Sequence, residues 1–238
     1  MVSISGSKKL KRQMAPQFWG IARKSGRFVV TAKPGPHKKN HAVPTAVLLR
    51  DMLKIVSTLR EAKTAIYSGK VRVDGVVRKS LHHAIGLMDV VELDGMIDIY
   101  RLAPSEDRLL KPVKIEESEK TKKLVRVISK TVIRGGKTQI GFHDGRSVMT
   151  DEKISVGDTC LIQIPDQKIL DSIKLESGVL CLVTSGVNAG QTGKVESLEE
   201  GTFILPKRAV LVLGSRKIEI PTDIIMAIGR EAPLIRLN

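Results

Sequence analysis

The sequence predicts an α+β protein, mostly β, that is built from several small modules. Its 238 residues suit two or three domains of ordinary size better than one small core. A short stretch with helical periodicity precedes a hairpin, and from about residue 85 brief alternating runs are separated by Gly, Asp and Pro. Apolar residues make up 42% of the chain but aromatic ones only 3%, so the cores must be small and aliphatic. We expect four segments: residues 1–43, 44–95, 96–176 and 177–238.

The net charge of +15 is carried by the first 80 residues. These hold 18 Lys or Arg and 3 Asp or Glu, whereas the remaining 158 residues hold 22 of each. A basic end beside a neutral remainder predicts docking onto a polyanion. A patch for a membrane surface is the rival interpretation, but it usually accompanies an amphipathic helix or lipid anchor, and the sequence suggests neither. No apolar run follows the basic start, so we expect a cytosolic protein without a signal peptide.

Residues 1–43 are predicted to form an irregular basic arm. Prolines and glycines interrupt any helix, and apolar residues are too few for a core. A disordered solubilising tail is the alternative. We favour an arm that becomes ordered on nucleic acid, because Trp19 lies beside Phe18 between basic clusters, and a solvated tail has little use for so large an apolar side chain. The candidate RNA contacts are Lys8, Lys9, Lys11, Arg12, Trp19, Arg23, Lys24, His37, Lys38 and Lys39.

Residues 44–95 are predicted to contain two helices and a hairpin. Apolar residues recur at helical spacing through Val56 after Pro44-Thr45, a plausible helix start. A second helix begins at Thr58, which forms a capping box with Glu61, and ends near Gly69. A tight hairpin follows, in which Asp74-Gly75 joins strands 71–73 and 76–78.

The polar faces of this unit carry an excess of positive charge. Charged residues on the outside of an amphipathic helix are ordinary. Here, however, the two helices and the hairpin together carry eight basic residues and only three acidic ones. That excess favours a phosphate-binding surface. Its candidate contacts are Arg50, Lys54, Arg60, Lys63, Tyr67, Arg72 and Arg78.

Two small antiparallel barrels are predicted beyond the hairpin, with a boundary near Ser177. Strands of the central barrel are expected at residues 124–127, 138–142, 160–164 and 169–173. Strands of the C-terminal barrel are expected at residues 179–183, 193–195, 203–205 and 210–212. Cys160 and Cys181 lack CxxC spacing and are expected to be reduced core residues.

Several short motifs invite a chemical role and are better explained as turns. Gly135-Gly136-Lys137-Thr138 resembles the end of a P-loop, but Thr131 stands where the first glycine belongs and a strand follows, so we predict a hairpin turn. His143-Asp144-Gly145-Arg146 contains a turn signal and no catalytic partner at a suitable spacing. His82-His83 has no metal-ligand partners and is expected to be structural or to face RNA. We therefore predict no cofactor, no metal and no small-molecule substrate.

The segment from Gly186 to Val195 is a stronger signal. Its three glycines and one asparagine allow a sharp loop that enters a strand and leaves backbone amides accessible to a partner. The candidate residues of this loop are Gly186, Asn188, Gly190, Gly193 and Lys194.

A series of short motifs, taken in order, resembles the archaeal and eukaryotic family of small-subunit ribosomal protein four. The motifs are Lys11-Arg12, Ala15-Pro16, Trp19, Gly35-Pro36-His37-Lys38, Leu49-Arg50-Asp51, Leu53-Lys54, Arg60-Glu61-Ala62-Lys63, Val71-Arg72-Val73-Asp74-Gly75, Gly86-Leu87-Met88-Asp89-Val90 and His143-Asp144-Gly145-Arg146. The resemblance implies that the helix-helix-hairpin is an alpha-L RNA-binding motif. It also implies that the loop from Gly186 is the KOW motif of an SH3-like barrel. The ending soon after Gly229-Arg230 resembles the archaeal form.

The predicted function is a non-catalytic structural role in the small ribosomal subunit. The arm and the alpha-L module would bind and bridge segments of small-subunit rRNA in the cytoplasm, and the barrels would serve as spacers or would meet neighbouring ribosomal proteins. One alternative is an RNA-modifying enzyme with an alpha-L module, which would need a large catalytic domain. Another is a KOW-containing transcription factor, which would leave the basic arm unexplained.

Overall fold

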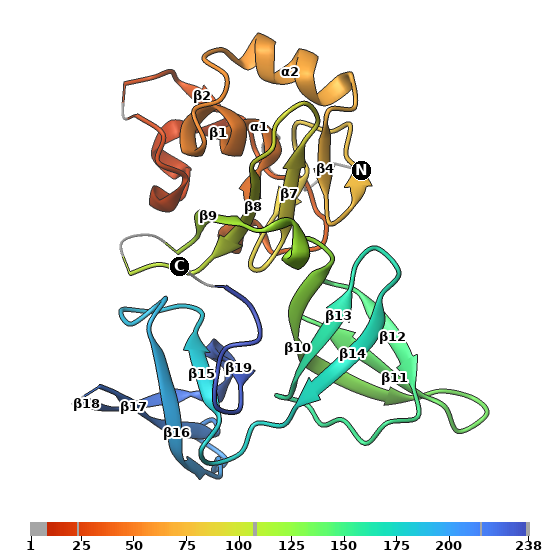
Figure 1. The fold of residues 1–238 in the computed structure, drawn as a ribbon. Coiled ribbons are helices and arrows are strands. Elements are labelled where there is room, and N and C mark those ends of the chain that lie inside the picture. Colours follow the sequence, from red (N-terminus) through yellow and green to blue (C-terminus); the bar gives the residue numbers. More distant parts are fainter. Residues whose placement is uncertain (1–8, 23, 107–108, 215, 237–238) are drawn as a thin grey trace, which may run out of the picture.

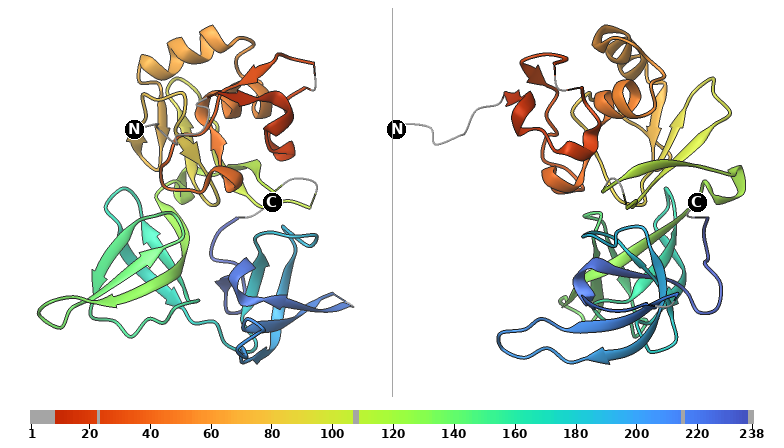
Figure 2. Two further views of the ribbon diagram at one scale, coloured as in Figure 1. Left: turned by 180° about the vertical axis from the view of Figure 1, so that it is seen from behind. Right: turned by 90° about the vertical axis from the view of Figure 1, so that its left-hand side faces the viewer.

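The computed structural model describes residues 9–22, 24–106, 109–214 and 216–236 and divides them into three modules. An N-terminal module lies above two β modules, the central one and the C-terminal one, which stand side by side beneath it (Figure 1). The same arrangement is seen from behind and from the side (Figure 2). The fold is mostly β with few helices, as predicted. Within the described residues, no helix is long and apolar enough to cross a membrane.

The described part of the N-terminal segment is folded onto the rest of the N-terminal module, and the prediction of a free arm is wrong for residues 9–22 and 24–43. Leu10, Trp19 and Ile21 are buried in the same apolar cluster as Val47 and Leu48. Short elements fix this segment: β1 (Leu10–Lys11) pairs with β2 (Phe28–Val29), and β3 (Val43–Pro44) pairs with β6 (Ala84–Ile85). Three 3-10 turns lie between them, η1 (Arg12–Met14), η2 (Gln17–Trp19) and η3 (Lys39–His41). The segment thus covers an apolar face that the helices alone would expose.

The two predicted helices differ in regularity. The first is a single α-helical turn, α1 (Thr45–Val47), that continues as a π-helix, η4 (Leu48–Met52), so the expected regular helix through Val56 is not formed. The second, α2 (Leu59–Tyr67), is confirmed. Thr58 Oγ1 accepts a hydrogen bond from the Glu61 N–H at 3.2 Å, and the Glu61 carboxylate accepts one from the Thr58 N–H at 3.3 Å, which completes the predicted capping box.

The hairpin belongs to a five-stranded antiparallel sheet that extends past residue 95. The strands, in spatial order, are β5 (Val76–Val77), β4 (Val71–Val73), β7 (Val90–Leu93), β8 (Ile99–Ala103) and β9 (Lys111–Ile115). The predicted boundary at residue 95 falls between β7 and β8, which pair with each other. Strands β8 and β9 therefore belong to the N-terminal sheet and not to the central barrel.

The central module, called the central barrel below, is a five-stranded sheet that curls around an aliphatic core (Figure 1). Its strands, in spatial order, are β12 (Ser147–Thr150), β11 (Thr138–Phe142), β10 (Lys122–Val132), β13 (Thr159–Gln163) and β14 (Lys168–Ile173). A 3-10 turn, η5 (Glu117–Glu119), precedes β10. Inward-facing Val125, Val127, Ile140 and Ile162 fill the core together with Cys160, which is reduced as predicted.

The C-terminal module is a second five-stranded sheet with its own core. Its strands, in spatial order, are β18 (Arg216–Pro221), β17 (Arg208–Leu213), β16 (Thr192–Glu199), β15 (Leu180–Val183) and β19 (Ile225–Gly229), with η6 (Thr222–Ile224) before the last. Cys181 is buried and reduced. The strand expected at residues 203–205 is absent: the pairing of β16 with β17 ends at Glu199 and Arg208, and the loop beyond exposes Phe203 and Ile204.

A shared apolar cluster holds the three modules together. Met88 of the N-terminal module, Leu124 and Leu161 of the central barrel and Met226 of the C-terminal sheet are all buried in it. The last described turn of the chain adds Ile235. The modules therefore present their outer surfaces in a fixed relation to one another.

Candidate nucleic-acid interface

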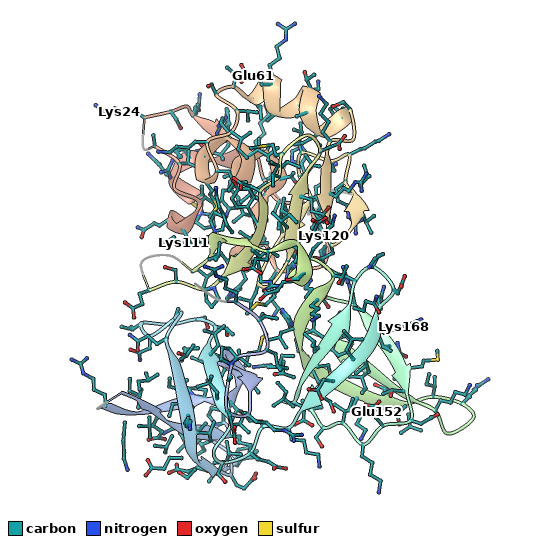
Figure 3. The ribbon with its side chains drawn as sticks, viewed as in Figure 1. Lys24, Glu61, Lys111, Lys120, Glu152 and Lys168 are labelled. Carbon is teal, nitrogen blue, oxygen red and sulfur yellow. The ribbon has the colours of Figure 1, made fainter. Side chains whose placement is uncertain are left out.

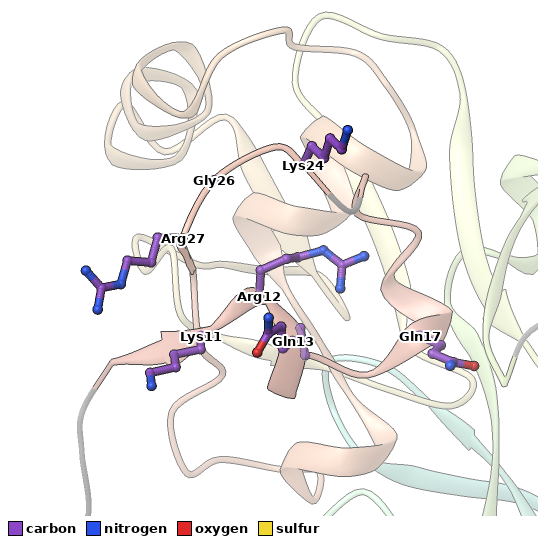
Figure 4. A pocket seen from close by; sticks show the side chains of 8 residues that line it. Lys11, Arg12, Gln13, Gln17, Lys24, Gly26 and Arg27 are labelled. Atoms are coloured by element: carbon purple, nitrogen blue, oxygen red, sulfur yellow. The ribbon is translucent and has the colours of Figure 1, made fainter.

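The N-terminal module carries a basic hollow of about 770 Å³ at the β1–β2 hairpin. Its lining includes four cationic side chains and no acidic one (Figure 4). The lining residues are Lys11, Arg12, Gln13, Ala15, Gln17, Lys24, Gly26 and Arg27. A concave surface of one sign concentrates the potential that attracts a polyanion.

Local hydrogen bonds shape this hollow. The N–H of Arg12 donates to the Arg27 carbonyl at 3.0 Å, which closes the hairpin. The Arg12 guanidinium donates to the carbonyls of Ala22, at 3.1 Å, and Ile21, and so braces the loop between the strands. The exposed Lys11 and Arg27 side chains extend outward from the loop (Figure 4). Arg12 thus supports the hollow, whereas its neighbours offer charge to a ligand.

An aromatic side chain stands at the rim of the same hairpin. Phe28 is 48% exposed, and Lys9 Nζ and the Arg27 guanidinium lie 5.6 and 5.4 Å from its ring centroid. An exposed ring flanked by cations is the arrangement on which unpaired bases stack. Sequence reasoning singled out Trp19 and missed Phe28 and Arg27, although the pair Arg27-Phe28 shows the same juxtaposition of charge and aromatic ring.

Helix α2 presents the second part of the basic surface. Ala62 and Ile66 are buried against the core, and Arg60, Lys63 and Tyr67 are exposed, as predicted. Lys63 Nζ lies 5.7 Å from the Tyr67 ring centroid, so this face repeats the pairing of a cation with an aromatic ring. Figure 3 shows Lys24 and Glu61 at the outer end of the N-terminal module, where both the hairpin and the helix reach solvent.

The remaining predicted cations of this module divide into free and engaged groups. Lys38, Lys39, Lys54 and Arg72 are exposed. Arg50 forms an ion pair with Asp51 at 2.8 Å, through its Nε and Nη2, so that edge of the guanidinium is not available to a phosphate. Arg78 is half-buried, and its Nε has no hydrogen-bond partner among the described residues. Lys8 and Arg23 lie outside the described residues.

Two of the predicted RNA contacts are core residues instead. Trp19 is fully buried, and its indole N–H donates to the Ala42 carbonyl at 2.9 Å. His37 is buried, with Nε2 at 3.0 Å from the Asp89 carboxylate. Neither side chain can reach an RNA molecule on the surface, because each is buried and hydrogen-bonded where the N-terminal segment packs on the module.

The loop from Gly186 to Val195 is packed against the N-terminal module. A Cβ at Gly190 would stand 2.9 Å from the Pro104 carbonyl oxygen, and Gln191 Nε2 donates to the Glu106 carboxylate at 2.6 Å. The amides of residues 189–191 donate to carbonyls within the C-terminal module, so the prediction that they are accessible is wrong. Gly193 is buried, Asn188 is half-buried, and Gly186 and Lys194 remain exposed.

Family models match three successive parts of the chain. The RS4NT (NUC023) domain matches residues 5–40, the S4 domain residues 47–91 and the ribosomal family S4e residues 96–169. The first two matches cover the basic hollow, helix α2 and the hairpin. The third covers the end of the N-terminal sheet and most of the central barrel.

Proteins of the same kind match over nearly the whole length. A small ribosomal subunit protein eS4 from Pyrobaculum arsenaticum is 40% identical over 96% of this chain and 98% of its own length. The eS4 protein of Methanothermobacter thermautotrophicus is 36% identical over 100% of this chain and 98% of its own. The crystal structure of the 30S ribosomal protein S4e from Thermoplasma acidophilum, 32% identical, covers 80% of this chain and 96% of its own, with a TM-score of 0.69. The chain belongs to the S4e family of ribosomal proteins.

Proposed function

We propose that this protein is a structural constituent of the small ribosomal subunit and binds rRNA through the outer surface of its N-terminal module. The observation that carries the proposal is the basic hollow, whose lining has four cations and no acid, beside the cation-flanked ring of Phe28. The names of the full-length relatives support the same role. They favour it over an RNA-modifying enzyme or a transcription factor, and they support a cytoplasmic, non-catalytic protein.

The proposed contacts are of two kinds. Exposed Lys and Arg side chains neutralise backbone phosphates and set affinity, and exposed rings stack on unpaired bases. The phosphate contacts are Lys9, Lys11, Lys24, Arg27, Lys38, Lys39, Lys54, Arg60, Lys63 and Arg72, with Phe28 and Tyr67 as stacking rings. Arg12 and Arg50 are partly engaged within the protein and Arg78 is half-buried, so these three contribute less.

This surface acts by matching RNA shape. Residues 9–22 and 24–43 are already folded as part of the module, so the described part of the surface binds with little further loss of conformational entropy. A preformed array of phosphate contacts selects RNA segments whose backbones fit its spacing. Neighbouring ribosomal proteins would meet the remaining surfaces of the protein in the subunit.

A charge-reversed helix face tests the proposal. Exchanging both Arg60 and Lys63 for Glu should abolish incorporation into the small subunit, because the new carboxylates would repel the RNA phosphates that the two cations attract. The melting temperature should change little, since exposed substitutions alter stability by about 0.5 kcal/mol or less. Lys168→Glu with Lys174→Glu, the same charge change on exposed residues of the central module, is the matched control. Normal incorporation of the Arg60 and Lys63 variant would contradict the proposal.

A further inference from the structure

The hairpin formed by β10 and β11 projects from the central barrel. β10 pairs with β13 only from Lys122 to Arg126, and beyond a bulge after Val127 its outer half pairs with β11 alone. The loop that joins the two strands extends away from the barrel at the side distant from helix α2 (Figure 1), and the view from behind shows the same projection (Figure 2). The barrel core needs no such extension, because its buried residues on these strands end at Val127 and Ile140.

The projecting part is positively charged and contains no acid. Lys130, Arg134 and Lys137 are all exposed, and the sequence from Val127 to His143 contains no Asp or Glu. Among the described residues, none of these three cations has a carboxylate oxygen within ion-pair distance. Asp151 and Glu152 follow the adjacent strand β12, and in the view of Figure 3 Glu152 lies on the body of the barrel.

Three basic side chains of the C-terminal module, by contrast, are paired with carboxylates. Lys207 pairs with Glu200 at 2.6 Å, Arg208 with Glu219 at 2.5 Å and Lys217 with Glu196 at 2.5 Å. The contrast matters, because a paired lysine adds no net attraction for a polyanion, whereas an unpaired one does. The neutral total charge of the last 158 residues thus conceals a local basic surface at the hairpin.

The tip of the hairpin is a hydrogen-bonded turn that is open to solvent. Gly135 and Gly136 adopt φ values of 92° and 76°, and the Ile133 N–H donates to the Lys137 carbonyl at 2.9 Å. No atom lies within 4 Å of the position that a Cβ would take at either glycine, so a ligand can approach the backbone closely. Val132 is 68% exposed beside these cations, which leaves an apolar surface for contact with sugar or base edges.

We propose that this hairpin, through Lys130, Arg134 and Lys137, is a second RNA-backbone anchor, separate from the N-terminal surface. A narrow two-stranded ribbon with unpaired cations is suited to lie along an RNA backbone and neutralise its phosphates. The inference rests on the proposed function, because rRNA is taken as the partner. The protein would then fix the relative positions of two RNA segments, since its modules are joined by a common buried cluster.

The test is a footprint of the whole protein on small-subunit rRNA, with a titration of affinity against salt. Replacing Arg134 and Lys137 by Glu should abolish protection of one RNA segment and leave intact the segment that depends on Arg60 and Lys63. The slope of log affinity against log salt should become shallower by about one unit for each phosphate that the variant no longer neutralises. Arg134→Lys with Lys137→Arg should retain the wild-type footprint. The Lys168→Glu and Lys174→Glu variant carries the same charge change on the same module and should also bind normally.

The outcomes separate this inference from the proposed function. An unchanged footprint and slope for the hairpin variant, with loss of binding in the helix variant, would overturn the anchor and leave the proposed function standing. Unchanged binding in both variants would overturn both. If the hairpin variant lost protection only in the RNA segment that depends on Arg60 and Lys63, a separate anchor would also be contradicted. The same would follow if, in the assembled subunit, the hairpin crosslinked to an acidic protein and not to RNA.

Discussion

Lys123 Nζ lies 2.7 Å from Asp74 Oδ2, and this buried ion pair joins the central barrel to the turn of the β4–β5 hairpin. The same ammonium lies 2.5 Å from Asp89 and 3.1 Å from Asp144. Burial alone would lower the pKa of Lys123, but the carboxylates of Asp89, Asp74 and Asp144 raise it above its usual range, so the group is charged. The hairpin turn therefore docks on the barrel, and only the outer side of the hairpin is left for RNA.

Removal of this charge should weaken the whole protein. Lys123→Met leaves three buried carboxylates without their shared cation, and breaking one side of a buried pair typically costs about 3–5 kcal/mol. Urea unfolding at neutral pH measures the loss. Lys122→Met, a neighbouring exposed lysine on the same strand, should change the free energy of unfolding by about 0.5 kcal/mol or less. Equal midpoints for the two variants would show that the cluster does not hold the modules together.

Acid should destabilise the protein through His143. Burial, and then the charge of Lys123, lower the pKa of His143 from its usual 6.5 to about 4 in the folded state. Between these values the unfolded chain binds the proton and the folded one does not, so the free energy of unfolding falls as the pH drops from about 6.5 to about 4. One such group contributes up to about 1.4 kcal/mol per pH unit. Burial, and then Arg78, also lower the pKa of His83, which acts in the same direction.

Melting curves across this pH range test the assignment. His143→Asn should make the dependence of stability on pH shallower between about 6.5 and 4, because one proton-linked group is removed. His41→Asn, the same exchange at an exposed position, is the control and should melt like the wild type at neutral pH. If both variants follow the wild-type curve, the loss of stability in acid has another origin.

Local signals in the sequence predicted local structure well. Thr58 and Glu61 lie three residues apart and cap α2 by themselves, and Asp74-Gly75 provides the left-handed backbone that its tight turn requires. The π-helix from Leu48 was not predictable in this way, because a five-residue segment is too short for apolar spacing to distinguish a π turn from an α turn. At Phe203 an apolar run suggested a strand, but strand formation needs a partner strand, and the ladder ends before it.

The errors at the candidate site have one physical origin, which is burial by residues distant in the sequence. Trp19 is enclosed by a segment that includes Ala42, 23 positions away, and His37 meets Asp89, 52 positions away. Local composition indicated an unfolded arm, because the sequence around Trp19 and His37 does not show which distant residues they contact. The outward residues of α2 were predicted correctly, since the face of a helix follows from its own periodicity.

The two aromatic residues of the N-terminal segment should respond to mutation in opposite ways. Trp19→Ala should cost about 3–5 kcal/mol in the free energy of unfolding, because it empties a fully buried site and leaves the Ala42 carbonyl without its donor. Phe28→Ala should cost about 1 kcal/mol or less, since the ring is half exposed. It should instead weaken rRNA binding by about 1–3 kcal/mol, the usual contribution of a stacked base.

Chemical denaturation and RNA titration on the same two variants separate the roles. Folding must be verified before binding is compared, so RNA affinity is measured at a temperature where Trp19→Ala remains native by circular dichroism. There the folded Trp19 variant should bind with nearly wild-type affinity, because the indole lies beneath the surface and contacts only protein. Wild-type affinity for Phe28→Ala would remove the ring from the interface. The cations around it would then bind phosphates without a stacking platform, and the basic hollow would recognise the RNA backbone alone.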